Sequence, residues 1–189
     1  MMQLDLYKLR IWIYRGLTAV VASLVILSAI LPWWIGDVSS DLIGHVGTIE
    51  IYQYGLSHHG FHNVGYAFHL TADETPLYQN VIAWIYIATI TGLILFSARL
   101  KEKKGSWLIG SLGFINIVYA LVAVYVVIAG RLSDFDISLQ GYSLITTEIP
   151  LSESVSINSS LQFGFYLACI AGSLCIVLSL LRIIVLNKN

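Results

Sequence analysis

Residues 17–35 read LTAVVASLVILSAILPWWI, an apolar run that contains no charged side chain. A transmembrane helix needs about 20 predominantly apolar residues, so this run is long enough to cross a bilayer. Lys8, Arg10 and Arg15 precede it, as basic residues precede a secretory signal. The apolar part is too long for a signal peptide, however, and no small-x-small cleavage site follows it. We therefore expect the run to be a membrane span.

Three more stretches of the chain meet the same length criterion. The chain of 189 residues has a mean hydropathy of +0.79 and only 11% charged residues, whereas soluble domains carry about 25%. We expect one tetraspan membrane domain over residues 1–189, with outer loops at about residues 36–78 and 131–160. The predicted spans are residues 17–35, 81–98, 107–130 and 161–186.

The basic residues indicate the orientation of these spans. Nine of the ten Lys and Arg residues lie on one side of the predicted spans, and Arg131 lies on the other. By the positive-inside rule, the basic side faces the cytoplasm. We therefore predict a multi-pass protein of the cell membrane with both termini cytoplasmic. The two long loops, which hold nine of the eleven acidic residues and all five histidines, are predicted to be extracellular.

The central parts of the spans contain no Asp, Glu, Lys, Arg or His. Ionisable residues inside the membrane mark ion paths, proton relays and cofactor ligands, so their absence argues against these functions. Asn116 is the one strongly polar residue at depth, and we expect it to hydrogen-bond to a neighbouring helix. Small residues four apart, Ser106 with Gly110 and Ala168 with Gly172, should let helices approach closely.

The two outer loops have the alternating pattern of β-strands. In residues 62–71, Val64, Tyr66, Phe68 and Leu70 alternate with smaller or polar residues, which predicts a half-buried strand. Residues 48–56 suit a preceding strand, with a hairpin loop at residues 57–61. In the second loop, residues 135–140 and 143–149 are predicted to pair across a turn at Gly141 and Tyr142.

The stretch after this second hairpin has two possible interpretations. Asn158 opens an N-x-S sequon, which could accept a glycan. The same residues, 158–160, could instead form the N-cap region of the last helix.

Because an isolated two-stranded hairpin is marginal in water, we expect the strands of both loops to combine in one sheet. The expected fold is therefore an all-α integral membrane four-helix bundle with a small extracellular antiparallel β-sheet formed by the two outer loops.

This arrangement resembles that of the tetraspan membrane proteins of the claudin and peripheral myelin protein type. The resemblance covers most of the chain at the level of topology, and it implies cytoplasmic termini, a long first outer loop and a sheet over the bundle. The family's first loop has a Trp–Gly–Leu–Trp-like stretch followed by two disulfide-bonded cysteines. The nearest counterpart here is Trp33–Trp34, and the outer loops contain no cysteine, so no functional residue is carried over.

Four of the five histidines lie within thirteen positions: His58, His59, His62 and His69. Neutral imidazole is the commonest protein metal ligand, so these residues are candidate ligands for Zn or Cu. Against this, adjacent residues of a strand lie on opposite faces, and His62 and His69 have opposite parity. We therefore expect the histidines to serve as polar or packing residues of the loop, with metal binding and pH sensing as the alternatives. We expect no cofactor, apart from Zn or Cu in the first of these alternatives.

The leading functional hypothesis is a non-enzymatic protein that associates with another membrane or cell-surface protein, or with itself, through its outer domain. It would be an accessory subunit, or an adhesion or assembly element, within the lipid bilayer. Alternatives are a subunit of a redox or metal-dependent membrane enzyme and, with less support, a small-solute channel or transporter. The net charge of −1 argues against a nucleic-acid partner. The candidate partner-binding residues are Trp33, Trp34, Tyr52, Tyr54, Tyr66 and Phe68.

Overall fold

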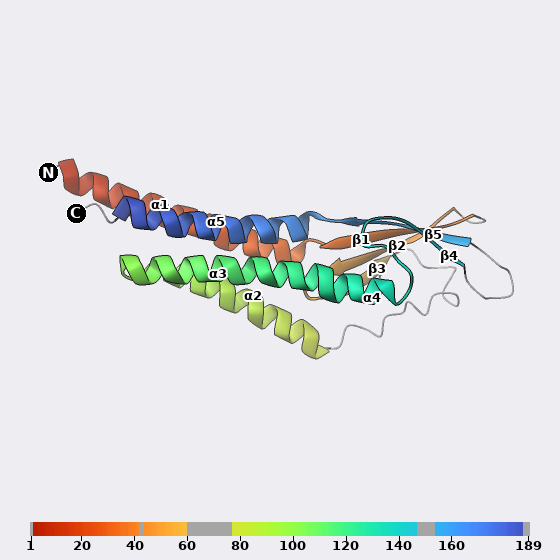
Figure 1. Ribbon diagram of the computed structural model, residues 1–189. Coiled ribbons are helices and arrows are strands. Elements are labelled where there is room, and N and C mark those ends of the chain that lie inside the picture. Colours follow the sequence, from red (N-terminus) through yellow and green to blue (C-terminus); the bar gives the residue numbers. More distant parts are fainter. Residues whose placement is uncertain (1, 42–43, 60–76, 147–153, 187–189) are drawn as a thin grey trace. The chain divides into compact units, whose positions relative to one another are not determined.

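The computed structural model describes residues 2–41, 44–59, 77–146 and 154–186 of the chain (Figure 1). The helices and strands, in chain order, are α1 (Met2–Ile30), β1 (Trp34–Ser40), β2 (Gly44–Tyr52), β3 (Gly55–His59), α2 (Leu77–Ser97), α3 (Glu102–Val122), the π-helix η1 (Ala123–Ile128), α4 (Ala129–Ser133), β4 (Gly141–Thr146), β5 (Ser154–Leu161) and α5 (Phe163–Leu186). The described residues form two compact units. We call the described residues within 1–27, 85–120 and 167–189 the helix unit, and those within 28–84 and 121–166 the sheet unit.

Four helical segments are long and apolar enough to cross a membrane, which confirms the predicted number of candidate spans in the described chain. They are Lys8–Ile30, Asn80–Ser97, Lys103–Ser133 and Phe163–Ile183. The first helix ends at Ile30, five residues before the predicted end at Ile35. The reason is Pro32, because proline disfavours the helical conformation of the residue before it and removes a backbone donor. Trp33 and Trp34 therefore lie outside the helix.

The third candidate span is one continuous helical stretch made of α3, η1 and α4. Within η1 the backbone hydrogen bonds join residues five apart, and the Ala129 N–H accordingly bonds to the carbonyl of Val124. The stretch ends in a Schellman-type turn, in which Asp136 has a φ of 57°. The N–H of Ile137 bonds to the Leu132 carbonyl at 2.9 Å, and that of Asp136 to the Ser133 carbonyl at 3.2 Å.

Small side chains bring α3 and α5 close together in the helix unit. A Cβ atom on Gly113 would lie 2.5 Å from the Gly172 carbonyl oxygen, so nothing larger than glycine fits there. Nearer the other end of α5, Ser106 Oγ donates to the Ser179 carbonyl at 2.7 Å. In return, Ser179 Oγ donates to the Ser106 carbonyl at 2.9 Å. The close helix approach predicted from the small residues is confirmed.

Asn116 is buried in the helix unit and bonds to a neighbouring helix, as predicted. Its Nδ2 donates to the carbonyl of Ala168 on α5 at 2.8 Å. Its Oδ1 accepts a longer bond of 3.4 Å from the hydroxyl of Tyr86 on α2, whose ring stacks on that of Tyr119. The amide thus links three helices through satisfied hydrogen bonds, which is a packing role.

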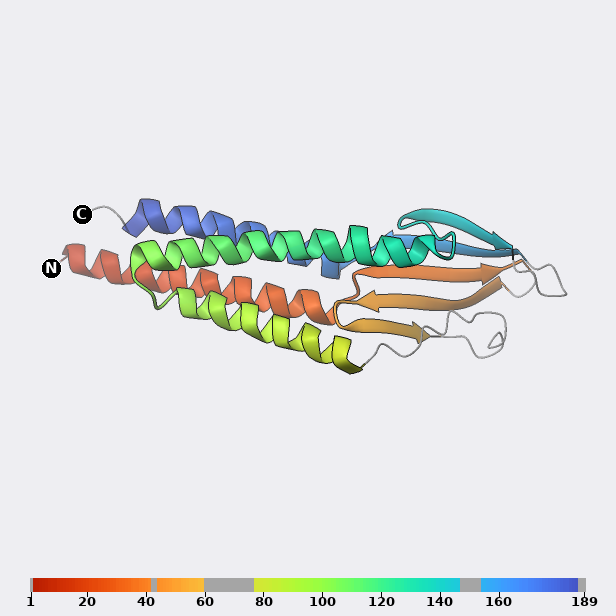
Figure 2. The ribbon, with the colours of Figure 1, turned by 60° about the horizontal axis from the view of Figure 1, so that its bottom comes forward.

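The sheet has five antiparallel strands in the order β3-β2-β1-β5-β4 (Figure 2). Segments from both predicted loop regions therefore meet in one sheet, as expected. The central strand β1 pairs with β2 on one side and with β5 on the other, with Val38 opposite Gly47 and Ile157. Neither β1 nor β5 was predicted as a strand from the sequence.

Several local predictions within this region are wrong. Residues 135–140 form a turn and an irregular segment, because the chain there completes the helix end described above. The β2–β3 turn is at Gln53 and Tyr54, so residues 57–59 belong to β3 and not to a hairpin loop. Asn158 lies in β5, and α5 begins only at Phe163, so the N-cap interpretation is also wrong. The predicted strand at residues 62–71 lies outside the described residues.

One face of the sheet is apolar and buried. Trp34, Val38 and Ile157 are each 0% exposed on this face. The segment that follows α4 is bonded to the same side, since Trp34 Nε1 donates to the Leu139 carbonyl at 2.9 Å. Ser159 Oγ donates to the Ser138 carbonyl at 2.6 Å, which adds a second link. The buried core of the sheet unit therefore combines both loop regions.

Candidate functional site

The other face of the sheet is polar and exposed, and it is the first candidate site. Directly opposite residues of neighbouring antiparallel strands lie on the same face. Tyr142 is opposite Asn158, Asn158 is opposite Asp37, and Asp37 is opposite Thr48, so these four residues form one row across four strands. Asp37 Oδ1 accepts a bond of 3.0 Å from Thr48 Oγ1. The row supplies hydrogen-bonding groups and one carboxylate to whatever faces it.

The row ends at β4, which is an edge strand of the sheet. In the described part of the chain, β4 pairs with β5 and with no further strand. Tyr142 and Leu144 lie two residues apart on this strand and are 64% and 55% exposed. Ser143, between them, is 6% exposed and faces the core. An edge strand has unpaired backbone N–H and C=O groups and can pair with another chain.

A second cluster lies at the β2–β3 turn. The Tyr52 and Tyr54 rings stack with centroids 5.2 Å apart, and Tyr54 stacks on Trp84 of α2 at 5.4 Å. The Tyr52 hydroxyl donates a hydrogen bond of 2.5 Å to Glu50 Oε2. This bond to the carboxylate, together with partial burial, raises the pKa of Tyr52 to about 12. The three stacked rings fix the turn against the start of α2.

Trp33 and Trp34 are packing residues in this structure. They are 1% and 0% exposed. Trp33 Nε1 donates to the Ser28 carbonyl at 2.7 Å, and its ring meets that of Phe165 edge-on. Of the six predicted partner-binding residues, Tyr52 and Tyr54 are half-buried at the turn. Tyr66 and Phe68 lie outside the described residues.

The metal site proposed for the histidines remains a prediction. His58 and His59 are in β3, where their positions pair with Ile49 and Thr48 of β2. His62 and His69 lie outside the described residues. Among the residues that the structure describes, no group of three or more His, Cys, Asp or Glu side chains could hold a metal ion.

Tyr142 and Leu144 are not among the site residues predicted from the sequence. The available signal is their two-residue spacing on either side of Ser143, in a stretch predicted to be a turn followed by a strand. Only the pairing order of the sheet makes them edge residues. No protein-family model matches this chain, and no curated protein is similar to it in sequence.

Proposed function

We propose that this is an integral membrane protein with four spans. The support is the distribution of apolar side chains on the helices. Large apolar residues are exposed as well as buried along each helix, and a helix that is apolar on all sides is typical of a membrane span. Examples of exposed residues are Val20 on α1, Ile85 on α2, Phe114 on α3 and Val177 on α5. In water, such a surface would cause aggregation.

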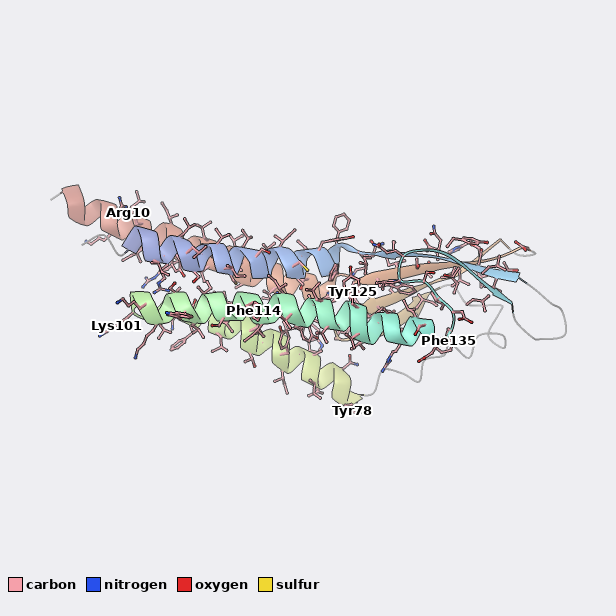
Figure 3. The ribbon with its side chains drawn as sticks, in the orientation of Figure 1. Arg10, Tyr78, Lys101, Phe114, Tyr125 and Phe135 are labelled. Carbon is pink, nitrogen blue, oxygen red and sulfur yellow. The ribbon has the colours of Figure 1, made fainter. Side chains whose placement is uncertain are left out.

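The ends of the candidate spans carry aromatic residues suited to the membrane interface. Trp12 and Trp107, in the helix unit, are 71% and 77% exposed. Tyr78 and Phe163, in the sheet unit, are 62% and 73% exposed, and Figure 3 shows the Tyr78 side chain at the start of α2. Exposed Trp and Tyr rings are enriched where helices leave the hydrocarbon core.

The distribution of charge then assigns the sides. Nine of the ten basic residues lie near the start of α1, near the α2–α3 turn or near the end of α5, and Arg131, in α4, is the exception. By the positive-inside rule these ends are cytoplasmic. Along the chain, the strands are connected to the helix ends opposite the basic ones. The sheet therefore lies on the extracellular side in this proposal.

The proposed activity is association with another membrane or surface protein through the β4 edge. The observation that carries it is the pair of exposed side chains, Tyr142 and Leu144, on an edge strand of the sheet. An extended segment of a partner can bond to the free edge of such a strand, while its side chains contact the exposed ones. The protein would thereby act as an accessory or assembly element, without catalysis of its own.

A site-specific crosslinking experiment tests this proposal. A photoreactive amino acid is placed at Leu144, or as a control at Ser160, which is exposed but lies on the inner strand β5. Irradiation of intact membranes should give a defined adduct from position 144, whose mass identifies another protein or a second copy. Equal adducts from both positions, or none from position 144, would contradict association through this edge.

Charge substitution provides a second test on the purified complex. Tyr142→Lys combined with Leu144→Lys should release the partner in mild detergent, because a charged edge disfavours strand addition. Ser160→Lys adds a charge to the same face away from the edge and should leave the complex intact. Retention of the partner by the double variant would exclude the β4 edge as its binding site.

A further inference from the structure

Arg182 is a buried arginine at which three helices of the helix unit meet. The residue is 3% exposed. Its Nη1 donates to the Ser97 carbonyl at 2.7 Å and to the Tyr14 hydroxyl at 3.3 Å, and its Nη2 donates to the Leu100 carbonyl at 2.6 Å. The guanidinium also lies 4.9 Å from the centre of the Tyr14 ring. The group therefore joins α1, α5 and the end of α2.

This guanidinium site is built into the packing of the helices. A Cβ atom on Gly105 of α3 would lie 2.6 Å from the Ser97 carbonyl oxygen and would collide with the Arg182 guanidinium. Glycine at position 105 thus leaves the space that the guanidinium fills. The Ser97 carbonyl belongs to the last turn of α2, where a cation also interacts favourably with the helix dipole.

The positive charge of Arg182 is only partly compensated. The acceptors supplied by the described residues are two carbonyls and a phenol, and all three are neutral. Its Nε is buried and has no hydrogen-bond acceptor among them. A buried cation costs several kcal/mol unless an opposite charge or further hydrogen bonds offset the cost. An anion near the guanidinium would therefore reduce the free-energy cost of burying this positive charge.

A pocket between α1 and α5 opens beside the guanidinium. It has a volume of about 150 Å³, and its apolar walls are formed by Ile13, Leu17, Leu178 and Leu181. Tyr14, Arg182 and a second arginine, Arg10, complete the lining. Arg10 is exposed on α1, near the N-terminal end of the helix (Figure 3). The surface of the pocket is almost wholly apolar, and two arginines belong to its lining.

We propose that this pocket binds an anionic phospholipid of the cytoplasmic leaflet. One acyl chain packs against the four apolar walls, and the phosphate lies at Arg10, where it also offsets the charge of Arg182. Arginine suits a phosphate because its planar fork can bond two oxygens. Basic pockets between helices on the cytoplasmic side are typical sites for anionic headgroups. The inference rests on the proposed membrane insertion and orientation.

Lipid retention by the full-length protein tests the inference. The purified protein is placed in nanodiscs that contain phosphatidylglycerol and phosphatidylcholine with the same chains. It is then transferred to detergent, and the lipids that remain bound are quantified by native mass spectrometry. We expect preferential retention of phosphatidylglycerol. Equal retention of both lipids would overturn the lipid site. It would not overturn the proposed membrane insertion, because the protein would still have entered the bilayer of the nanodisc.

Two arginine variants separate this site from general attraction to a basic surface. Arg10→Gln should reduce phosphatidylglycerol retention about fivefold, as expected for the loss of one basic contact. Arg15→Gln removes an exposed arginine of the same helix that does not line the pocket, and it should leave retention unchanged. Equal losses in the two variants would overturn the proposal. Arg10 is used because Arg182 also holds the helices together.

A third arm distinguishes a lipid from a free anion. Inorganic phosphate, added in excess to the lipid-loaded protein, should leave the lipid bound because it cannot fill the apolar part of the pocket. Displacement of the lipid by phosphate would contradict a lipid site. Failure of the protein to enter nanodiscs would overturn the proposed membrane insertion, and the lipid site with it.

Discussion

The indole N–H of Trp34 donates a hydrogen bond of 2.9 Å to the carbonyl oxygen of Leu139, which lies 105 residues further along the chain. The ring itself covers Gly36, since a Cβ atom at that position would lie 2.5 Å from the indole. One buried side chain thus connects β1 with the segment that leads from α4 into β4. The core of the sheet unit depends on this long-range contact.

Replacement of Trp34 by Phe should therefore destabilise the protein. The substitution keeps an aromatic ring but leaves a partly buried carbonyl without its donor, which costs about 1–3 kcal/mol. The free energy of unfolding, measured by denaturant titration in mild detergent, should fall by this amount. Trp12→Phe is the matched control, because Trp12 is 71% exposed. Equal effects of the two substitutions would contradict a special role of Trp34.

The close approach of α3 and α5 gives a prediction about two glycines. A methyl group at Gly172 would lie 2.6 Å from Ile117 Cγ1 and 2.8 Å from the Gly113 carbonyl oxygen. Gly172→Ala should cost about 1–3 kcal/mol through overpacking. At Gly92 on α2 there is nothing within 4 Å, so Gly92→Ala should be neutral or stabilising. Thermal unfolding of both variants in the same detergent checks the difference.

The bond between Tyr52 and Glu50 predicts a pH dependence. The pKa of Tyr52 is raised to about 12 in the folded protein, so the folded state favours the protonated phenol. Its contribution to stability is complete below the ordinary tyrosine pKa of about 10 and is lost as the pH rises through about 12. Glu50→Gln should lower the pKa of Tyr52 towards the ordinary value.

Ultraviolet titration of the phenolate measures this shift. The difference between the titration curves of the native protein and of Tyr52→Phe isolates Tyr52 from the other ten tyrosines of the eleven in the chain. The same difference, taken in a Glu50→Gln background, should have its midpoint at lower pH. An unchanged midpoint would mean that the carboxylate does not control the ionisation of Tyr52.

The helices could be predicted from the sequence more fully than the sheet. A span is encoded by a local run of apolar residues, so residues 81–98 and 107–130 were recognised by length and hydropathy. The strands β1 (WIGDVSS) and β5 (SVSINSSL) are rich in Gly and Ser, which have little intrinsic preference for strands. They form strands because each pairs with neighbours on both sides, and one of these pairings, between β1 and β5, joins segments that are distant in the sequence.

The same limit applies to the candidate sites. Tyr142 and Leu144 are edge residues because of the order in which the strands pair. That order cannot be predicted from the pattern of apolar and polar residues within one loop. The sequence predicts Arg182 only as one of the nine basic residues on the cytoplasmic side. Its burial follows from the convergence of Tyr14, Ser97 and Leu100 around it, which only the packing of three helices produces.

Side-specific labelling of single cysteines is the most direct test of the central claim, that the sheet lies outside the cell and the α2–α3 turn inside. Cys169 and Cys175 are both free, and they are replaced by Ala. One new cysteine is then placed at Ser160 in β5 or at Lys101, both of which are exposed. A membrane-impermeant maleimide should label position 160 in intact cells and position 101 only after permeabilisation. Labelling of position 101 in intact cells, or protection of position 160, would contradict the account.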